Sequence, residues 1–155
     1  MIKIIKEVSK NKKQQITLDI MTALSKWFGP KEDIEKKSLI HRDYMFFTVY
    51  YNKKPIGFAA LKIHNKFTID IYNMGILEEY QSIGIGRKLL IEIEKYCKKN
   101  NFKYLTVKTL DSSCKYRPYE KTRSFYKKAG FIPLEVFKNF WNEDNPCLFM
   151  VKNIE

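Results

Sequence analysis

Apolar residues along the chain recur with two spacings, which together predict a series of strands and helices. A spacing of three or four residues, typical of one apolar face of a helix, occurs over four segments. The predicted helices cover residues 11–28, 34–40, 84–99 and 119–129. Short runs rich in β-branched and aromatic residues, bounded by polar turns, predict strands. The predicted strands cover residues 2–8, 44–51, 55–64, 66–77, 103–109, 131–137 and 147–151.

The order of these elements predicts the fold class. Residues 44–77 hold three consecutive strands, and a strand–helix–strand–helix–strand succession begins with the last of them. We therefore expect an α/β fold, with a mixed, mostly antiparallel twisted sheet of six to seven strands and about four helices. No internal repeat, flexible linker or low-complexity tract divides the sequence, so we expect a single domain over residues 1–155.

Composition agrees with a globular protein. Hydrophobic residues make up 45% of the 155 positions, which argues against disorder. No apolar stretch approaches the roughly 20 residues that span a bilayer, and the first residues lack the apolar centre of a signal peptide. We expect a cytoplasmic protein without a membrane association.

The formal charge of +12 favours a polyanionic partner without naming it. Nucleic acid, an anionic membrane surface and a phosphate-rich ligand such as coenzyme A all fit, and so does a solvated lysine-rich surface. The basic residues are spread along the chain, and the basic–aromatic motifs of nucleic-acid-binding modules are absent from the sequence. Nucleic-acid binding therefore stays a rival reading that we do not expect.

Cysteines and histidines give no sign of a metal site. The three cysteines, Cys97, Cys114 and Cys147, are widely separated and form neither a CxxC pair nor an even disulfide framework. Only His41 and His64 are available as imidazole ligands. We predict buried or half-buried thiols and no metal.

The segment with the clearest chemistry lies between a predicted strand and a predicted helix. It reads Gln81-Ser82-Ile83-Gly84-Ile85-Gly86-Arg87. Backbone N–H groups at a helix N-terminus have no intrahelical partners and carry partial positive charge. Glycines at 84 and 86 allow a diphosphate to approach them closely, and Arg87 adds charge. A glycine turn that merely starts a helix is the alternative.

Two other glycine motifs do not fit. A Walker A loop requires Gly-Lys-Ser/Thr, and Gly86 is followed by Arg87. A dinucleotide fingerprint requires a third glycine three residues after Gly86, where Leu89 stands. The pattern Gln-x-x-Gly-x-Gly, with Phe125-Tyr126-Lys127-Lys128-Ala129-Gly130-Phe131 downstream, instead resembles the GNAT superfamily of N-acetyltransferases. The order of predicted elements resembles that family's fold over nearly the whole chain.

The resemblance implies an acyl-CoA N-acyltransferase fold and acetyl-CoA as the acetyl donor. It places the thioester and the pantetheine arm against backbone groups of Met74, Gly75 and Ile76, with one N–H polarising the acetyl carbonyl. It implies that the diphosphate is held, largely by main chain, by Gln81, Ser82, Ile83, Gly84, Ile85, Gly86 and Arg87. Many relatives have an Asn where Tyr119 stands, so Tyr119 either contacts the cofactor differently or belongs to the acceptor site.

Two catalytic residues follow from the same resemblance. Tyr126 matches the tyrosine that often protonates the departing CoA thiolate, although packing of an inner helix face is the simpler role. Alternation along residues 66–77 puts Phe67, Ile69 and Ile71 on a core face and Asp70 on the other face. Asp70 matches the position of a catalytic glutamate in some relatives, so we propose it as the base. A solvent-facing carboxylate is the alternative there.

The acceptor is only loosely defined. Glu78 and Glu79 are alternative bases that we expect to face solvent. The family's architecture makes His41, Tyr44, Phe140 and Trp141 loose candidates for the acceptor side, although packing in the core is the more common role for any single one of them. The resemblance implies a small-molecule amine acceptor, direct transfer and the homodimers common in the family, while the sequence does not decide the oligomeric state. A CoA-binding module without catalysis is the main alternative function.

Overall fold

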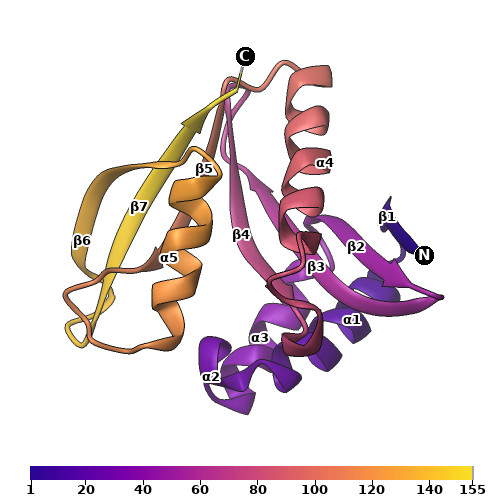
Figure 1. Ribbon diagram of the computed structural model, residues 1–155, viewed down its shortest axis with the longest axis horizontal. Helices are drawn as coiled ribbons and strands as arrows, with labels where there is room; N and C mark the ends of the chain where they lie inside the picture. Colours follow the sequence, from indigo (N-terminus) through magenta and orange to yellow (C-terminus); the bar gives the residue numbers. More distant parts are fainter. Residues whose placement is uncertain (155) are drawn as a thin grey trace. The chain divides into compact units, whose positions relative to one another are not determined.

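The computed structural model describes residues 1–154 and confirms the predicted α/β architecture (Figure 1). Within that range, the elements in chain order are β1 (Ile2–Lys6), α1 (Lys10–Ala23), α2 (Ser25–Phe28), α3 (Lys31–His41), β2 (Met45–Tyr51), β3 (Lys54–Ile63), β4 (Thr68–Ile76), the 3₁₀ turn η1 (Glu78–Tyr80), α4 (Ile85–Lys99), β5 (Tyr104–Leu110), α5 (Pro118–Lys128), β6 (Ile132–Asn142) and β7 (Asn145–Asn153).

Pairing of the strands gives a mixed sheet, as expected. Its order is β1-β2-β3-β4-β5-β7-β6. The β4–β5 pair is parallel, whereas β1–β2, β2–β3, β5–β7 and β6–β7 are antiparallel. The connection between the parallel strands β4 and β5 carries α4, as a parallel crossover requires.

The chain forms two compact units. The first comprises residues 1–62 and 72–96, and the second comprises residues 63–71 and 97 onward. Strand β4 contributes its first half to the second unit and its second half to the first. The single domain over residues 1–155 stays a prediction.

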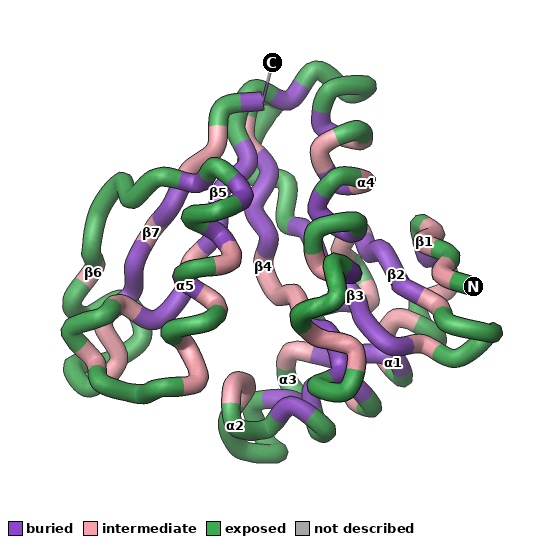
Figure 2. Tube along the Cα trace, in the orientation of Figure 1, coloured by how far each residue is buried: buried purple, intermediate pink, exposed green. Residues whose placement is uncertain are grey.

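In the first unit, the helices α1, α2 and α3 pack together beside the strands β2 and β3 (Figure 1). Both strands are buried over most of their length (Figure 2). Fully buried side chains from strands and helices fill this core, among them Phe46, Phe58, Ile20, Met21, Leu89, Leu90 and Ile93. A glycine suits the close approach of β3 and β4, because a Cβ at Gly57 would overlap Ile76 Cδ1 and lie 3.1 Å from the Gly75 carbonyl oxygen, so both neighbours would have to shift.

The long helix predicted over residues 11–28 is interrupted, so residues 1–154 contain five α-helices where we expected about four. Leu24 has φ −109° and ψ 34°, outside the helical range, and separates α1 from α2. Its N–H group donates to the carbonyls of both Ile20 and Met21, so the helix tightens before it breaks. Leu24 is buried despite the break, so apolar spacing alone did not reveal it.

In the second unit, β5 lies between β4 and β7, and α5 packs on β5. The first residues of β4 pair with β5, with Asp70 opposite Thr106. One sequence prediction is wrong here: Phe67, assigned to the core face, precedes β4 and is 43% exposed. Its ring instead lies near the ammonium groups of Lys66 and Lys103, at 5.0 and 6.0 Å.

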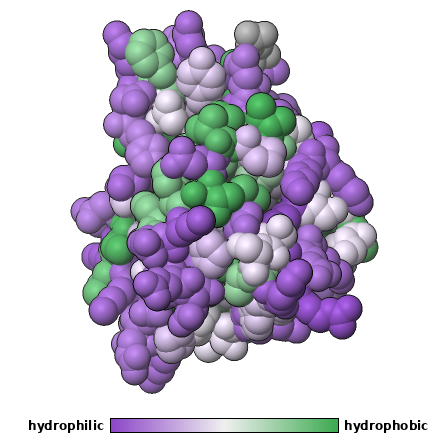
Figure 3. Space-filling model, turned by 90° about the vertical axis from the view of Figure 1, so that its left-hand side faces the viewer, coloured by the Kyte–Doolittle hydropathy of each residue, from purple (hydrophilic) through white to green (hydrophobic). Residues whose placement is uncertain are grey.

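Strand β6 forms the outer edge of the second unit and is exposed along almost its whole length (Figure 2). Figure 3 views the molecule from the side on which β6 lies in Figure 1, and apolar side chains interrupt the hydrophilic surface there. The exposed apolar side chains of β6 are Ile132, Leu134, Val136, Phe140 and Trp141. Because β6 is the last strand in the sheet order and pairs with β7, its other edge leaves backbone groups without a partner strand.

Candidate active site

In the first unit, the segment between β4 and α4 has the backbone form of an anion cradle. Ser82 and Gly84 both have left-handed φ values, 64° and 88°, and α4 begins at Ile85. Gly84 is exposed, and a Cβ built on it would meet nothing within 4 Å. The loop is thus held open by backbone conformation rather than filled by neighbouring side chains.

The N-terminus of α4 is electrostatically suited to an anion. Lys88 N–H donates to the Gly84 carbonyl at 3.1 Å, and N–H groups of the first helical turn have no intrahelical acceptor. The first turn contains no acidic residue, and Arg87 and Lys88 there are exposed. A helix dipole favours acidic side chains at this end. Because basic residues stand there instead, no acidic side chain neutralises the positive end of the helix, and this end can attract a bound anion.

Gln81 fastens this loop to the end of β4. Its Nε2 donates to the Ile76 carbonyl at 2.7 Å. Its main-chain N–H also donates within the protein, to the Glu78 carbonyl at 3.1 Å, so Gln81 supports the loop through both its side chain and its main chain. Ile85 is buried, and its side chain belongs to the core rather than to the ligand side.

The second half of β4 is covered by α1 and α2. A Cβ at Gly75 would lie 3.0 Å from Leu24 Cδ1 and 3.3 Å from Phe28 Cε2, so glycine allows this close packing. Met74 is half-buried, and Ile76 is 8% exposed. Met74, Gly75 and Ile76 form the end of a buried strand, where main-chain groups rather than side chains can meet a ligand.

His41 lies in the core of the first unit, and its imidazole joins three elements. Nδ1 lies 2.8 Å from the Thr17 hydroxyl of α1, and Nε2 lies 2.7 Å from Asn73 Oδ1 of β4. His41 is fully buried, so of the two roles considered for it, the acceptor side and core packing, the structure supports core packing. Burial lowers the pKa of His41 from 6.5 to about 4; the hydrogen bond to Asn73 opposes this shift, and the charge of Lys37 adds to it.

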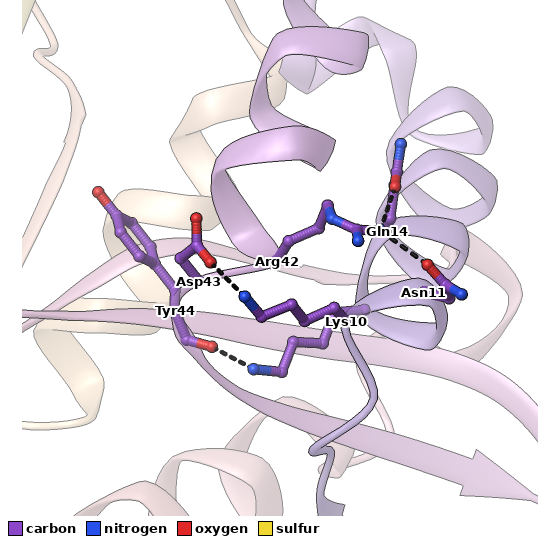
Figure 4. A network of polar contacts seen from close by, with 7 residues as sticks. Lys10, Asn11, Gln14, Arg42, Asp43 and Tyr44 are labelled. Carbon is purple, nitrogen blue, oxygen red and sulfur yellow. Dashed lines mark hydrogen bonds and ion pairs between the residues drawn. The ribbon is translucent and has the colours of Figure 1, made fainter.

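A polar network fixes the chain segment that follows His41 (Figure 4). It connects α1 to the turn between α3 and β2. The contacts are Lys10 Nζ to Asp43 Oδ1 (3.1 Å), Lys13 Nζ to the Tyr44 carbonyl (2.7 Å), and Arg42 Nη1 to Asn11 Oδ1 and Gln14 Oε1 (both 2.8 Å). The position of Tyr44 is therefore set by helix α1.

The buried imidazole predicts an acid-sensitive fold. The unfolded chain protonates His41 at about pH 6.5, whereas the folded protein does so only at about pH 4. Above pH 6.5, the contribution of His41 to the unfolding free energy should be complete. Between pH 6.5 and 4 this contribution should fall by up to about 3 kcal/mol, and below pH 4 it should change no further. Urea unfolding of wild type and His41→Gln at both pH values measures the difference. A pH dependence identical in the two proteins contradicts it.

In the second unit, Asp70 is buried rather than solvent-facing, at 2% exposure. Thr106 Oγ1 donates to Asp70 Oδ1 at 2.6 Å, and Lys108 Nζ lies 3.7 Å from the same oxygen. Both contacts fall on Oδ1, and none of the described residues hydrogen-bonds to Oδ2. A carboxylate held through one oxygen keeps the other available as a proton acceptor.

Tyr126, on the inner face of α5, is buried, and its ring contacts Phe125 and Phe131 with centroids 5.2 and 5.4 Å apart. The packing role is therefore real. Its hydroxyl, however, makes no hydrogen bond within residues 1–154. Burial raises the pKa of this phenol well above its usual range, and the charge of Asp70 adds to the shift. Tyr126 accordingly stays protonated at neutral pH and can act as a proton donor.

The second unit contains two further side chains whose pKa is raised by burial, Tyr119 and Cys147. Tyr119 lies in the first turn of α5, 6.2 Å from the ring of Tyr116, and burial raises its pKa to about 12. Cys147 of β7 is fully buried, and burial raises the pKa of its thiol to about 11. Cys97 is buried and Cys114 is half-buried, as predicted, and none of the three cysteines forms a disulfide within residues 1–154.

The expected residues thus fall into two groups. The second unit brings together Asp70 and Tyr126, while the first unit holds the backbone of Met74 to Ile76 and the loop before α4. Glu78 and Glu79 are exposed, as expected, and Glu78 pairs with Lys26 at 3.1 Å. No group of three metal-ligating side chains occurs within residues 1–154, and none of the helices there is long and apolar enough to cross a membrane.

Sequence reasoning missed the partners of Asp70. Thr106 and Lys108 alternate on β5 and so point to the same face. That alternation was visible in the sequence. Their meeting with Asp70 depends on the parallel register of β4 and β5, which no sequence pattern specified.

Comparisons with known proteins agree on one family. The model of the acetyltransferase (GNAT) family matches residues 14–131. N-alpha-acetyltransferase 50 of Danio rerio is 26% identical over 102 residues, which cover 63% of this chain and only 57% of that protein.

Solved structures share the fold at low identity. A protein assigned to the GNAT family from Desulfovibrio desulfuricans has a TM-score of 0.86 at 19% identity, covering 100% of both chains. A GNAT acetyltransferase from Elizabethkingia anophelis with acetyl-CoA bound has a TM-score of 0.76 at 22% identity, covering 98% of this chain and 97% of the other.

Proposed function

This chain belongs to the acetyltransferase (GNAT) family, and we propose that it transfers the acetyl group of acetyl-CoA directly to a primary amine of a small molecule. The observation that carries the proposal is the open loop before α4, with its left-handed Ser82 and Gly84 and its basic first turn. A diphosphate fits this arrangement chemically, and acetyl-CoA is bound in the Elizabethkingia relative of the same fold.

The proposed binding roles follow the two groups of residues. Main-chain N–H groups of the loop and the charge of Arg87 hold the diphosphate. Backbone groups of Met74, Gly75 and Ile76 hold the pantetheine arm and polarise the thioester carbonyl. Tyr119 is assigned to the cofactor side with a contact that differs from the asparagine of many relatives.

The proposed reaction is a single displacement. The amine nitrogen attacks the thioester carbonyl carbon, the new C–N bond forms, and the C–S bond breaks. Asp70 Oδ2 takes the proton that the nitrogen loses, and the Tyr126 hydroxyl donates a proton to the departing CoA sulfur. The raised pKa of the buried Cys147 thiol argues against an acetyl-cysteine intermediate, because a neutral thiol is a poor nucleophile.

Changing Gly84 should weaken cofactor binding specifically. Valine is strongly disfavoured at the φ of 88° that Gly84 adopts, so the loop must change its backbone in Gly84→Val. We expect the Kd for acetyl-CoA to rise at least about tenfold, because the N–H groups no longer point together. Isothermal titration measures it. Gly29→Val is the matched control, since Gly29 is also exposed at φ 79° but lies after α2. Equal affinity in both variants contradicts a diphosphate site at the loop.

A screen of primary amines tests the function. The protein is incubated with acetyl-CoA and each amine, and free thiol and acetylated product are measured together. We expect stoichiometric release of CoA and product with at least one amine. Tight binding of acetyl-CoA and CoA alike, with no amine acetylated, would favour the CoA-binding module instead. Binding of a DNA or RNA duplex that weakens steeply with salt would point to the nucleic-acid reading.

A further inference from the structure

The side chain of Asn73 has an unusual arrangement of hydrogen bonds. Its Oδ1 lies 2.7 Å from His41 Nε2, and its Nδ2 makes no hydrogen bond to any residue in the range 1–154. Asn73 is half-buried on β4, next to Met74, whose backbone we assign to the thioester. One end of the amide is therefore fixed inside the protein, and its two N–H donors are left over.

The fixed end is held by a rigid buried group. His41 is fully buried and remains neutral at physiological pH. With Nε2 donating to Asn73 Oδ1, Nδ1 is bare and can only accept a proton. The Thr17 hydroxyl on α1 lies 2.8 Å from both Nδ1 and the Lys13 carbonyl, and it can give its one proton to either. The contact between Nε2 and Oδ1 turns the Asn73 N–H groups away from His41.

Aromatic rings lie near His41, the hydrogen-bond partner of Asn73. Tyr44 and Tyr72 contact each other edge to face with centroids 5.1 Å apart, and both lie near the His41 ring, at 6.5 and 5.9 Å. Both tyrosines are half-buried, and the network of Figure 4 holds Tyr44 in place. Gly75, two residues after Asn73 on β4, is covered by Phe28. Asn73 therefore lies beside an imidazole that is itself packed among aromatic side chains.

We propose that Asn73 is the acceptor-recognition residue of the first unit, that it binds an oxygen atom located beside the reacting amine, and that His41 is its positioning residue. The inference rests on the proposed function. Amide N–H groups donate and do not accept, so the preferred acceptor carries a carbonyl or hydroxyl oxygen on the carbon next to the one that bears the amine. An alkyl amine of the same size leaves the donors unpaired, which costs binding.

Matched amines test the proposal. Glycinamide and ethanolamine have the oxygen, and propylamine has a methyl group in its place. For wild type, kcat/KM should be about tenfold higher with either oxygen-bearing amine than with propylamine, the size expected for one neutral hydrogen bond. In Asn73→Leu that preference should disappear through the loss on glycinamide and ethanolamine, while propylamine changes less than twofold. A preference retained in Asn73→Leu, or equal losses on all three amines, overturns the proposal.

Two further variants separate recognition from folding. Asn73→Asp keeps an oxygen for His41 Nε2–H but removes both donors, so it should also lose the preference. His41→Phe frees the Asn73 amide and should raise KM for glycinamide about threefold with kcat unchanged. His41→Gln, whose Nε2 donates like the imidazole, should restore KM. Loss of kcat in His41→Phe with no recovery in His41→Gln would show a purely structural role.

The role proposed for Asn73 can be tested by binding even if the protein acetylates no amine. Binding of glycinamide and propylamine is then measured by titration onto wild type and Asn73→Leu saturated with CoA. Tighter binding of glycinamide that is lost in the variant supports the inference although the proposed reaction has failed. Equal binding of both amines to wild type overturns the inference separately.

Discussion

Asp70→Asn is expected to lower kcat/KM with any accepted amine by about 100-fold, the typical size of a lost general base. Asparagine keeps an oxygen for the Thr106 hydroxyl, so the side chain stays in place. It cannot take the proton from the attacking nitrogen. The residual rate should then increase with pH toward the pKa of the free amine, because only the deprotonated amine reacts. Steady-state kinetics from pH 6 to 10 measure both effects.

The matched control for Asp70 is Thr106→Val. Valine removes the hydroxyl that contacts Oδ1 and leaves the carboxylate and its free Oδ2, so kcat/KM should stay within about threefold of wild type. The Kd for acetyl-CoA should be unchanged in both variants. If Asp70→Asn keeps wild-type activity, or if Thr106→Val loses as much as Asp70→Asn does, the carboxylate is a structural anchor for Lys108 and not the base.

Tyr126→Phe is the second large expected effect, a fall in kcat of about tenfold to 100-fold at unchanged acetyl-CoA affinity. The ring and its contacts with Phe125 and Phe131 remain, and only a hydroxyl without a protein partner is removed. The loss should be smaller than that of Asp70→Asn, because a thiolate departs without full protonation. Since burial keeps the phenol protonated, wild-type kcat should show no decline from Tyr126 ionisation up to pH 9.

Tyr104→Phe provides the control for Tyr126, because Tyr104 lies on β5 with 44% of its surface exposed. It should leave kcat unchanged. A normal kcat in Tyr126→Phe would reduce the tyrosine to its packing role and leave water as the proton source.

The sequence predicted the fold well where apolar spacing is regular. All seven described strands were predicted, although β6 runs to Asn142 and not to residue 137, and the bounds of α4 and α5 were predicted to within one residue. Helix α4 buries Leu89, Leu90 and Ile93 at helical spacing, whereas α5 buries Tyr126 together with the charged Arg123. The break at Leu24 was not predicted, because Leu24 is buried whether the helix continues through it or ends before it. Phe67 was misplaced because alternation was extended one residue beyond the start of β4, into a loop where lysines surround the ring.

Glycine and strand–helix patterns predicted the backbone part of the candidate site. Contacts between residues far apart in the sequence were not predicted. Glycine spacing between a strand and a helix predicted the loop, since backbone conformation there depends on neighbouring residues alone. The burial of Asp70 and its contacts with Thr106 and Lys108 depend on residues 36 and 38 positions away. The link from Thr17 through His41 to Asn73 likewise joins three elements, and none of its members carries a motif.

Following an isotope-labelled acetyl group tests the central claim most directly. The protein, acetyl-CoA labelled in its acetyl group and glycinamide are incubated together, and the products are identified by mass spectrometry and NMR. The account predicts that all label lost from acetyl-CoA appears on the amine nitrogen, with one CoA thiol released per acetylated product, and that Asp70→Asn and Tyr126→Phe slow this transfer. Label that stays on CoA with every amine, or that appears only as acetate, would contradict it.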